Sequence, residues 1–241
     1  MSRDLHKKFF NSRLSAGWVH TVLASDDGHF YGFGVSKDGE LGHGVGFTEF
    51  QASQLNFNIP SIAKPELVQV AVGARHTLIL ADGNVYSSGA PDDGRLGHHL
   101  VHGQIKFPNV DKIAYISCGA DGSVAISEDG RTMYVWGRGY TSAASPEPVA
   151  IRLFDPVTKT PFVSKVISAV CGTEHALALC QDGTVWSWGK GRNGRLGHGN
   201  EADCSTPTII KSLIVSEDQK IVQVCLHRAL QTHSGTGCSL P

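Results

Sequence analysis

The chain has 241 residues, of which 41% are hydrophobic and 18% are charged, and its formal net charge at neutral pH is −1. This composition supports a globular core and excludes a chain that is disordered throughout. The near-neutral charge argues against a nucleic-acid binder, which needs a concentrated basic face.

The start of the chain, residues 1–13, contains no apolar signal core, and no stretch anywhere approaches the ~20 apolar residues of a membrane span. The six cysteines form no C-x-x-C pair, which argues against structural zinc and thioredoxin-like chemistry. We therefore expect an intracellular protein, cytoplasmic or nuclear, with reduced thiols.

Four copies of one sequence pattern follow. The first runs from residue 17 to 44 as GWVHTVLASDDGHFYGFGVSKDGELGHG, two close copies span 73–98 and 172–199, and a degraded copy begins at residue 119. Their first glycines lie about fifty residues apart, a period typical of solenoids, propellers and other repeat arrays. These glycines are Gly17, Gly73, Gly119 and Gly172.

This period predicts one continuous array of units. We expect an N-terminal tail over residues 1–13, units over 14–66, 67–112, 113–165 and 166–220, a partial fifth unit over 221–225, and an irregular C-terminal tail over 226–241. The fifth unit is indicated by Val222-Gln223-Val224, which repeats Val68-Gln69-Val70, but no Asp-Gly hairpin follows it.

Each copy contains an apolar segment, then Asp-Gly, then a second apolar segment. This arrangement is a strong signal for a β-hairpin with a type I′ turn, in which both central residues have positive φ. The four pairs are Asp27-Gly28, Asp82-Gly83, Asp129-Gly130 and Asp182-Gly183. With a β-branched stretch before the first glycine, three to four short strands per copy are predicted, so the protein is predicted to be all-β.

Position by position, the copies also predict how each unit is packed. Cys118 and Cys171 precede a first glycine where other copies have Ala16 and Val72, which indicates a small buried apolar slot. Three copies close on a glycine-framed loop ending in Leu-Gly-His, and its leucines are predicted to plug the units while the glycines permit tight turns. These leucines are Leu41, Leu96 and Leu196.

Histidines recur at two fixed positions, near the start of a copy and in the Leu-Gly-His motif. The opening histidines are His20, His76 and His175, and the closing ones are His43, His98 and His198. A residue repeated by every unit is expected to serve the unit itself, for example by bonding a backbone group in the next loop. The alternative, three opening histidines converging on a metal ion, is weakened by Gly122, which replaces the histidine of the third copy.

The ordered set of marks resembles the regulator of chromosome condensation repeat family: the G-x-x-H opening, the Asp-Gly hairpin, an aromatic-x-x-G segment and the Leu-Gly-His close. The resemblance covers residues 14–224, with the third copy partial. Full members fold as seven-bladed β-propellers. The resemblance therefore implies an incomplete all-β propeller with about four blades plus the first strand of a fifth.

The third copy departs from the pattern most, since it lacks Leu-Gly-His after Gly137 and is predicted to have a remodelled loop. Four blades cut from a ring would also leave two blade faces uncovered. At ~25 cal/mol per Å², a face of about 400 Å² forgoes roughly 10 kcal/mol of burial. The chain is therefore expected to be a fragment or shortened isoform, to self-associate or bind a partner through these faces, or to be marginally stable.

The loop positions inside the constant glycines differ between copies, as expected of a recognition surface on a rigid scaffold, although solvated loop tips would look the same. Candidate partner-binding residues are Lys37, Asp38, Glu40, Asp92, Asp93, Arg95, Arg192, Asn193 and Arg195. Trp186 and Trp188 are further anchor candidates, but core positions are the preferred interpretation for both.

No catalytic, cofactor or metal site is assigned. Gly189–Gly194 spell G-x-G-x-x-G, but no amphipathic helix follows, which argues against a dinucleotide site. No serine occupies a G-x-S-x-G elbow. We expect a non-enzymatic module that binds a protein partner. The resemblance implies two alternatives, guanine-nucleotide exchange on a Ran-like small GTPase, as the founding family member performs, and a chromatin-associated adaptor.

Overall fold

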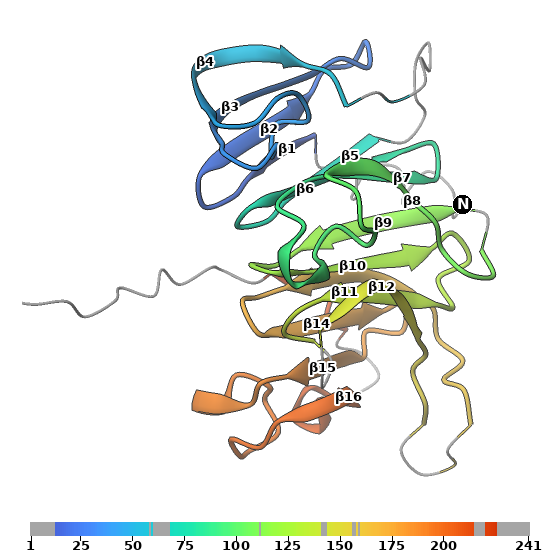
Figure 1. Ribbon diagram of the computed structural model, residues 1–241. Helices are drawn as coiled ribbons and strands as arrows, with labels where there is room; N and C mark the ends of the chain where they lie inside the picture. Colours follow the sequence, from blue (N-terminus) through green and yellow to red (C-terminus); the bar gives the residue numbers. More distant parts are fainter. Residues whose placement is uncertain are drawn as a thin grey trace, which may run out of the picture.

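The computed structural model describes residues 13–57, 59, 68–110, 112–140, 144–155, 158, 160–214 and 220–225. Within these ranges the chain forms four antiparallel sheets of four strands each, so the all-β prediction is confirmed. Figure 1 shows the sheets stacked in chain order, from the blue sheet at one end to the orange sheet at the other. We call the sheets blades 1 to 4.

Every blade is a meander in which strands adjacent in sequence pair side by side. Blade 1 contains β1 (Leu14–Ala16), β2 (His20–Ala24), β3 (Phe30–Ser36) and β4 (Phe47–Leu55). Blade 2 contains β5 (Val68–Val72), β6 (His76–Ala81), β7 (Asn84–Gly89) and β8 (His102–Ile105). Blade 3 contains β9 (Ile113–Cys118), β10 (Gly122–Ser127), β11 (Met133–Gly137) and β12 (Ser145–Ile151). Blade 4 contains β13 (Val166–Cys171), β14 (His175–Cys180), β15 (Val185–Gly189) and β16 (Cys204–Ile209).

Neighbouring blades contact one another through their first two strands. β1 and β2 lie against β5, β5 and β6 against β9, and β9 and β10 against β13. An apolar cluster fills each of the three interfaces. The described residues therefore form an incomplete β-propeller, as predicted from the repeats.

The turn between the first two strands has the same geometry in all four blades. The amide of the first glycine donates to the carbonyl three residues later, for example Gly17 to His20 at 2.9 Å and Gly172 to His175 at 2.8 Å. The carbonyl of the residue just before the second strand accepts from an amide at or just after the end of the third strand, as Val19 does from Val35 and Asp121 from Arg138. Equivalent sequence positions thus occupy equivalent places.

The Asp-Gly hairpins form, but the predicted type I′ turn is wrong for three of them. Only Asp82 among the four aspartates has a positive φ, 47°, in a loop that joins the pair Ala81 and Asn84. The other loops are longer, closing for example from Cys180 to Thr184, so the glycine alone needs the left-handed region. The register of the pairing strands, and not the dipeptide, determines the turn type.

The predicted leucine plugs are confirmed, and the predicted slot is buried in blades 2, 3 and 4 but not in blade 1, where Ala16 is exposed. Leu41 and Leu96 are fully buried, and Leu196 is 1% exposed. Cys118 and Cys171 are buried at the ends of β9 and β13. Trp186 and Trp188 lie in the core between blades 3 and 4, which confirms the preferred interpretation of both.

Two of the three opening histidines, His20 and His76, tie one blade to the next through a hydroxyl group. Nε2 of His20 lies 2.8 Å from Oγ1 of Thr77 in blade 2, and Thr77 donates at 2.7 Å to the carbonyl of Glu40 in blade 1. Nε2 of His76 likewise lies 2.9 Å from Oγ of Ser123 in blade 3. His20 and His76 thus serve the packing of the blades, although the link to the loop carbonyl passes through a hydroxyl, and for His175 the predicted role stays a prediction.

Blade 3 makes a different contact with blade 4. Gly122 replaces the histidine and Ala176 replaces the hydroxyl residue, so both partners are missing together. Tyr140 fills the space, because a Cβ added at Gly122 would lie 2.4 Å from its ring. The Tyr140 hydroxyl donates to the Gly172 carbonyl at 2.8 Å. One phenol thus replaces the two-residue link.

The described residues 220–225, where the fifth unit is predicted to begin, lie against blade 4. Lys220 lies over Gly183 as Lys112 lies over Gly83, and Ile221 and Val224 pack against blade 4. The predicted first strand is wrong for the described residues 221–225, which form no strand. A strand requires a ladder partner, and these residues pair with none of the described strands. The predicted C-terminal tail, 226–241, and residues 1–12 lie outside the described residues.

Candidate functional site

The first turns of all four blades and the glycine-framed loops of blades 1, 2 and 4 lie at one end of the sheets, which we call the loop end. Blade 2 has the short turn η1 (Asp92–Gly94) in its loop, and blade 4 has η2 (Arg192–Gly194). In blade 3, residues 138–144 connect β11 to β12 without the Leu-Gly-His motif. A cleft of about 710 Å³ lies beside this shortened connection.

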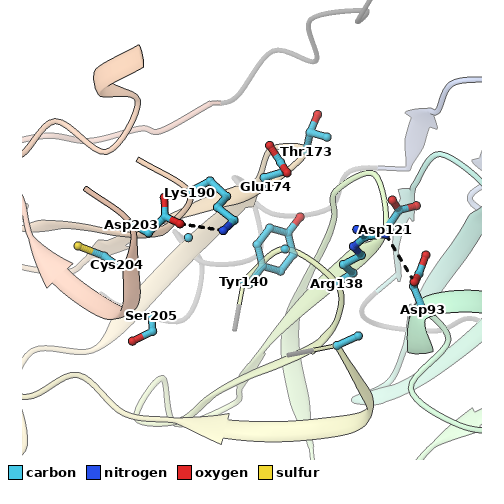
Figure 2. A pocket seen from close by; sticks show the side chains of 13 residues that line it. Asp93, Asp121, Arg138, Tyr140, Thr173, Glu174, Lys190, Asp203, Cys204 and Ser205 are labelled. Carbon is cyan, nitrogen blue, oxygen red and sulfur yellow. Dashed lines mark hydrogen bonds and ion pairs between the residues drawn. The ribbon is translucent and has the colours of Figure 1, made fainter. Parts of the chain in front are cut away.

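Residues from three blades line the cleft (Figure 2). Blade 2 contributes Asp93, and blade 3 contributes Asp121, Arg138 and Tyr140, whereas blade 4 contributes Glu174, Lys190, Asp203 and Cys204 among others. Figure 2 shows Lys190 and Asp203 on one side, Arg138, Asp121 and Asp93 on the other, and Tyr140 between them. Since β16 begins at Cys204 and β10 just after Asp121, ordered strands support both walls.

One wall of the cleft is held by a buried guanidinium. Arg95 is 3% exposed and forms ion pairs with Asp93 at 3.2 Å and with Asp121 at 2.9 Å. Arg138 extends over Asp93 at 3.8 Å, and its side chain is 68% exposed. Arg95 therefore fixes two carboxylates, while Arg138 presents a mobile positive charge to solvent.

The opposite wall carries a surface ion pair. Nζ of Lys190 donates to Asp203 at 2.7 Å, and the second oxygen of Asp203 accepts from the Gly191 amide at 3.0 Å. The hydrogen bond to Asp203 raises the pKa of Lys190, and the same bond lowers the pKa of Asp203. Both groups therefore stay charged around neutral pH. Both side chains are about half exposed.

A buried indole donor in blade 4 has no acceptor among the described residues. In blades 2 and 3, Ser88 and Trp136 each reach back to a carbonyl of the preceding loop, Ser88 to Gly39 and Trp136 to Arg95 at 2.9 Å. Trp188 occupies the equivalent position in blade 4, and it is fully buried. Its Nε1 finds no partner among the described residues, because the loop that would supply the carbonyl is shortened in blade 3. An unpaired buried N–H costs free energy and is a ready partner for an incoming acceptor.

The residues predicted to contact a partner divide into exposed and buried groups. Lys37, Asp92, Asp93, Arg192 and Asn193 are exposed at the loop end, and Asp38 and Arg195 are half-buried there. Only Asp93 of this set lines the cleft.

Glu40 and Arg95 are buried instead, at 1% and 3% exposed. We therefore give them a role in holding the loops together and leave them out of the proposed contact surface. Burial raises the pKa of Glu40, whose carboxylate accepts from the Asp38 amide at 2.8 Å. Arg75 of blade 2 pairs with Asp38, and this hydrogen bond raises the pKa of Arg75. The loop of blade 1 is thereby tied to blade 2.

The closing histidines are also structural, as predicted. Nε2 of His98 lies 2.8 Å from Oγ of Ser87, and the pair His198 and Ser187 repeats this contact at 3.0 Å. Both serines donate to the carbonyl of the plug leucine in the same loop. These bonds close each loop onto the third strand of its blade.

Sequence reasoning missed most of the cleft, including Arg138, Glu174, Lys190 and Asp203. The missing Leu-Gly-His motif of the third copy was the signal, since a missing loop between two intact ones leaves a gap. Among the described residues, no group of three or more His, Cys, Asp or Glu side chains is placed to hold a metal ion. No helix in the described ranges is long and apolar enough to cross a bilayer.

The chain matches known proteins at the level of its repeats. The model described as the regulator of chromosome condensation repeat matches residues 82–126 and 182–229, and a second model of that repeat matches 166–195. The ultraviolet-B receptor UVR8 of Arabidopsis thaliana is 31% identical, over 84% of this chain and 46% of the receptor. This chain therefore spans about half the length of that relative.

Solved structures show the same architecture. Human WBSCR16 aligns with a TM-score of 0.69 at 24% identity, over 82% of this chain and 52% of that one. Prp20p of Saccharomyces cerevisiae aligns with a TM-score of 0.63 at 22% identity, over 82% of this chain and 50% of that one. The matches to the repeat models and to UVR8, together with the repeated Gly-x-x-His turns, Asp-Gly hairpins and leucine plugs, show that the chain belongs to the regulator of chromosome condensation repeat family.

Proposed function

We propose that this chain is a non-enzymatic protein-interaction module and that a partner protein binds in the cleft at the loop end of blade 3. The observation that carries the proposal is a cleft of about 710 Å³, lined by residues of three blades, at the place where blade 3 lacks its repeat loop. A partner segment that lies in this gap takes the place of the missing loop.

The charges of the cleft favour a protein segment over a small ionic ligand. Acidic groups from blades 2, 3 and 4 face two exposed cations, Arg138 and Lys190, and most of these charges already pair with a neighbour. A surface with charges of both signs has no strong net electrostatic field. It recognises a partner by forming ion pairs with side chains of opposite charge on that partner. Arg138 is the most exposed of them and is the first candidate for a contact at the centre of the interface.

The test is quantitative capture of partners from cells with the full chain and with a double charge reversal, Arg138→Glu with Lys190→Glu. A matched control reverses Arg131 and Lys211, two exposed cations at the other end of the sheets. We expect the double variant in the cleft to lose at least tenfold of the bound partner and the control to retain it. Equal capture by both variants would contradict the proposal.

Guanine-nucleotide exchange on a Ran-like GTPase is the second candidate. The observation that favours it is the structural likeness to Prp20p, a protein reported with its binding properties to Gsp1p and histones. A propeller face can lower nucleotide affinity by binding the GTPase better in its nucleotide-free state. Release of labelled GDP from Gsp1p, with and without the chain, tests exchange, and retention on nucleosomes at increasing salt tests the chromatin-adaptor alternative.

We include an intracellular location, cytoplasmic or nuclear, in the proposal. It is supported by Cys118, Cys171 and Cys180, which are free thiols in the blade cores. Tagging the full chain and following it by fluorescence microscopy tests this part independently of binding.

A further inference from the structure

The outer face of blade 4, which is turned away from blade 3, carries the groups that join blades elsewhere in the molecule. At each boundary of blade 2 an opening histidine meets a hydroxyl of the next blade, at 2.8 Å from His20 to Thr77 and at 2.9 Å from His76 to Ser123. His175 is the equivalent residue of blade 4. It is half-buried.

A charge pair accompanies the histidine at the same boundaries. The loop of blade 1 offers Asp38 to Arg75 in the first turn of blade 2, and the loop of blade 2 offers Arg95 to Asp121 in the first turn of blade 3. The sign of the charge reverses from one boundary to the next. Each first turn is therefore matched to the loop that precedes it.

The loop of blade 4 offers an arginine, as the loop of blade 2 does, and not an aspartate as in blade 1. Nε of Arg195 donates to the carbonyl three residues earlier, Arg192, at 2.8 Å, as Nε of Arg95 does to Asp92 at 2.9 Å. The two guanidinium groups are thus held alike. Arg195 pairs within its own blade, with Glu174 at 3.6 Å, where Arg95 pairs with the next blade at 2.9 Å.

We propose that the outer face of blade 4 docks a further blade of the same repeat type from another protein, and that Arg195 and His175 select a blade with an acidic residue in its first turn followed two residues later by Ser or Thr. Blade 3 has this pattern in Asp121-Gly122-Ser123, where it meets Arg95 and His76. The acidic residue draws the guanidinium across the boundary, and the hydroxyl bonds the histidine.

The rest of this face is apolar and only partly covered. Leu179 and Val185 are buried under Ile221 and Val224, while Leu177 is half-buried. The segment Lys220–Cys225 pairs with no described strand, and Val222 is 85% exposed. A docking blade therefore displaces a segment whose described residues pair with no described strand, and its own first strand takes that position.

A second copy of this chain lacks the acidic half of the pattern. The free face of blade 1 offers Val19 and Thr21, and Val19 occupies the place of Asp121 because the carbonyls of both accept the same backbone bond at or just after the end of the third strand. Thr21 matches Ser123, but Val19 gives Arg195 no charge. The pattern therefore favours a different protein, and it shows how to turn this chain into a probe.

The probe is the full chain with Val19→Asp, a residue that is 41% exposed, so the fold tolerates the change. We expect head-to-tail association, measured by sedimentation velocity over a concentration series, to be about tenfold tighter than for wild type. The matched control is Val45→Asp, which adds the same charge to an exposed residue of the blade 1 loop. Adding Arg195→Glu to Val19→Asp should remove the gain, and Val19→Lys with Arg195→Glu should restore it.

Three results would overturn the proposal. If Val19→Asp associates no more tightly than Val45→Asp, the outer face of blade 4 does not recognise an acidic residue in the first turn of the docking blade. A gain that survives Arg195→Glu would place the contact elsewhere, for example between two blade 1 faces. Wild-type chain that already associates as tightly as Val19→Asp would show that a second copy, and not an acidic blade, is the occupant.

Discussion

The boundary between blades 2 and 3 and the boundary between blades 3 and 4 solve the same packing problem with different residues. The first uses His76 with Ser123 and a buried Arg95, whereas the second uses Tyr140 and the indole of Trp188. The polar link is continuous in the first case and leaves an unpaired donor in the second. A repeat can therefore lose its shared residues at one boundary, keep its packing, and gain a cleft.

The largest effect should come from the aromatic packing of the second boundary. Trp188→Ala empties a fully buried site between blades 3 and 4 and should lower the free energy of unfolding by about 3–5 kcal/mol. The control Trp18→Ala removes a half-exposed indole and should change it by less than about 0.5 kcal/mol. Urea unfolding followed by circular dichroism measures both, and equal losses would show that the boundary is not held by Trp188.

The next effect tests how Tyr140 replaces a histidine. A methyl group at Gly122 would meet the Tyr140 ring at 2.4 Å and the Arg138 carbonyl at 2.6 Å. Gly122→Ala should therefore destabilise the fold by about 1–3 kcal/mol through overpacking. A variant as stable as wild type in the same urea experiment would mean that Tyr140 does not occupy this space.

Removing one hydroxyl at each kind of boundary separates the two polar links. Thr77→Val deprives both His20 and the Glu40 carbonyl of their bond and should cost about 1–3 kcal/mol. Tyr140→Phe removes one bond, to the Gly172 carbonyl, and should cost about 1 kcal/mol. A larger loss for Tyr140→Phe would reverse the ranking of the two links.

Two histidines make the fold sensitive to acid. Burial lowers the pKa of His98 and of His175 below the ordinary value of 6.5. The unfolded chain therefore binds protons first, so stability is complete above pH ~6.5 and falls as the pH is lowered through that value. We expect a lower Tm at pH 5.5 than at pH 7.5, and a weaker pH dependence in His98→Gln; a Tm that rises on acidification would contradict this.

The smallest effect concerns thiol reactivity. Burial raises the pKa of the Cys180 thiol to about 12, whereas Cys225 is exposed. Because the thiolate is the reactive form, iodoacetamide at pH 8 should label Cys225 well before Cys180. Mass spectrometry of tryptic peptides measures the order, and faster labelling of Cys180 would show that blade 4 opens in solution.

The repeat made most of the fold predictable, because residues that recur at fixed spacing occupy equivalent places. The hairpins, the leucine plugs and the buried Cys118 and Cys171 follow from single positions and their periodicity. The turn type at Asp82 differs from the other three because the pairing register decides it, and register depends on both strands.

The cleft was not predictable in the same way. Its walls combine Asp93, Arg138 and Lys190, which come from three blades and from positions that the repeat does not conserve. Tyr140 substitutes for a residue at position 122, a different place in the pattern, so alignment of the copies conceals the replacement. Only the missing Leu-Gly-His motif of the third copy pointed to this region.

The central claim is that the partner binds where blade 3 lacks its loop. Site-directed photo-crosslinking in cells tests it most directly, with a benzoylphenylalanine residue placed at Arg138 in the cleft or at Lys211 beyond the far end of β16. We predict a crosslinked partner from position 138 and none from position 211. Crosslinks that are equal from both positions, or absent from position 138, would contradict the claim.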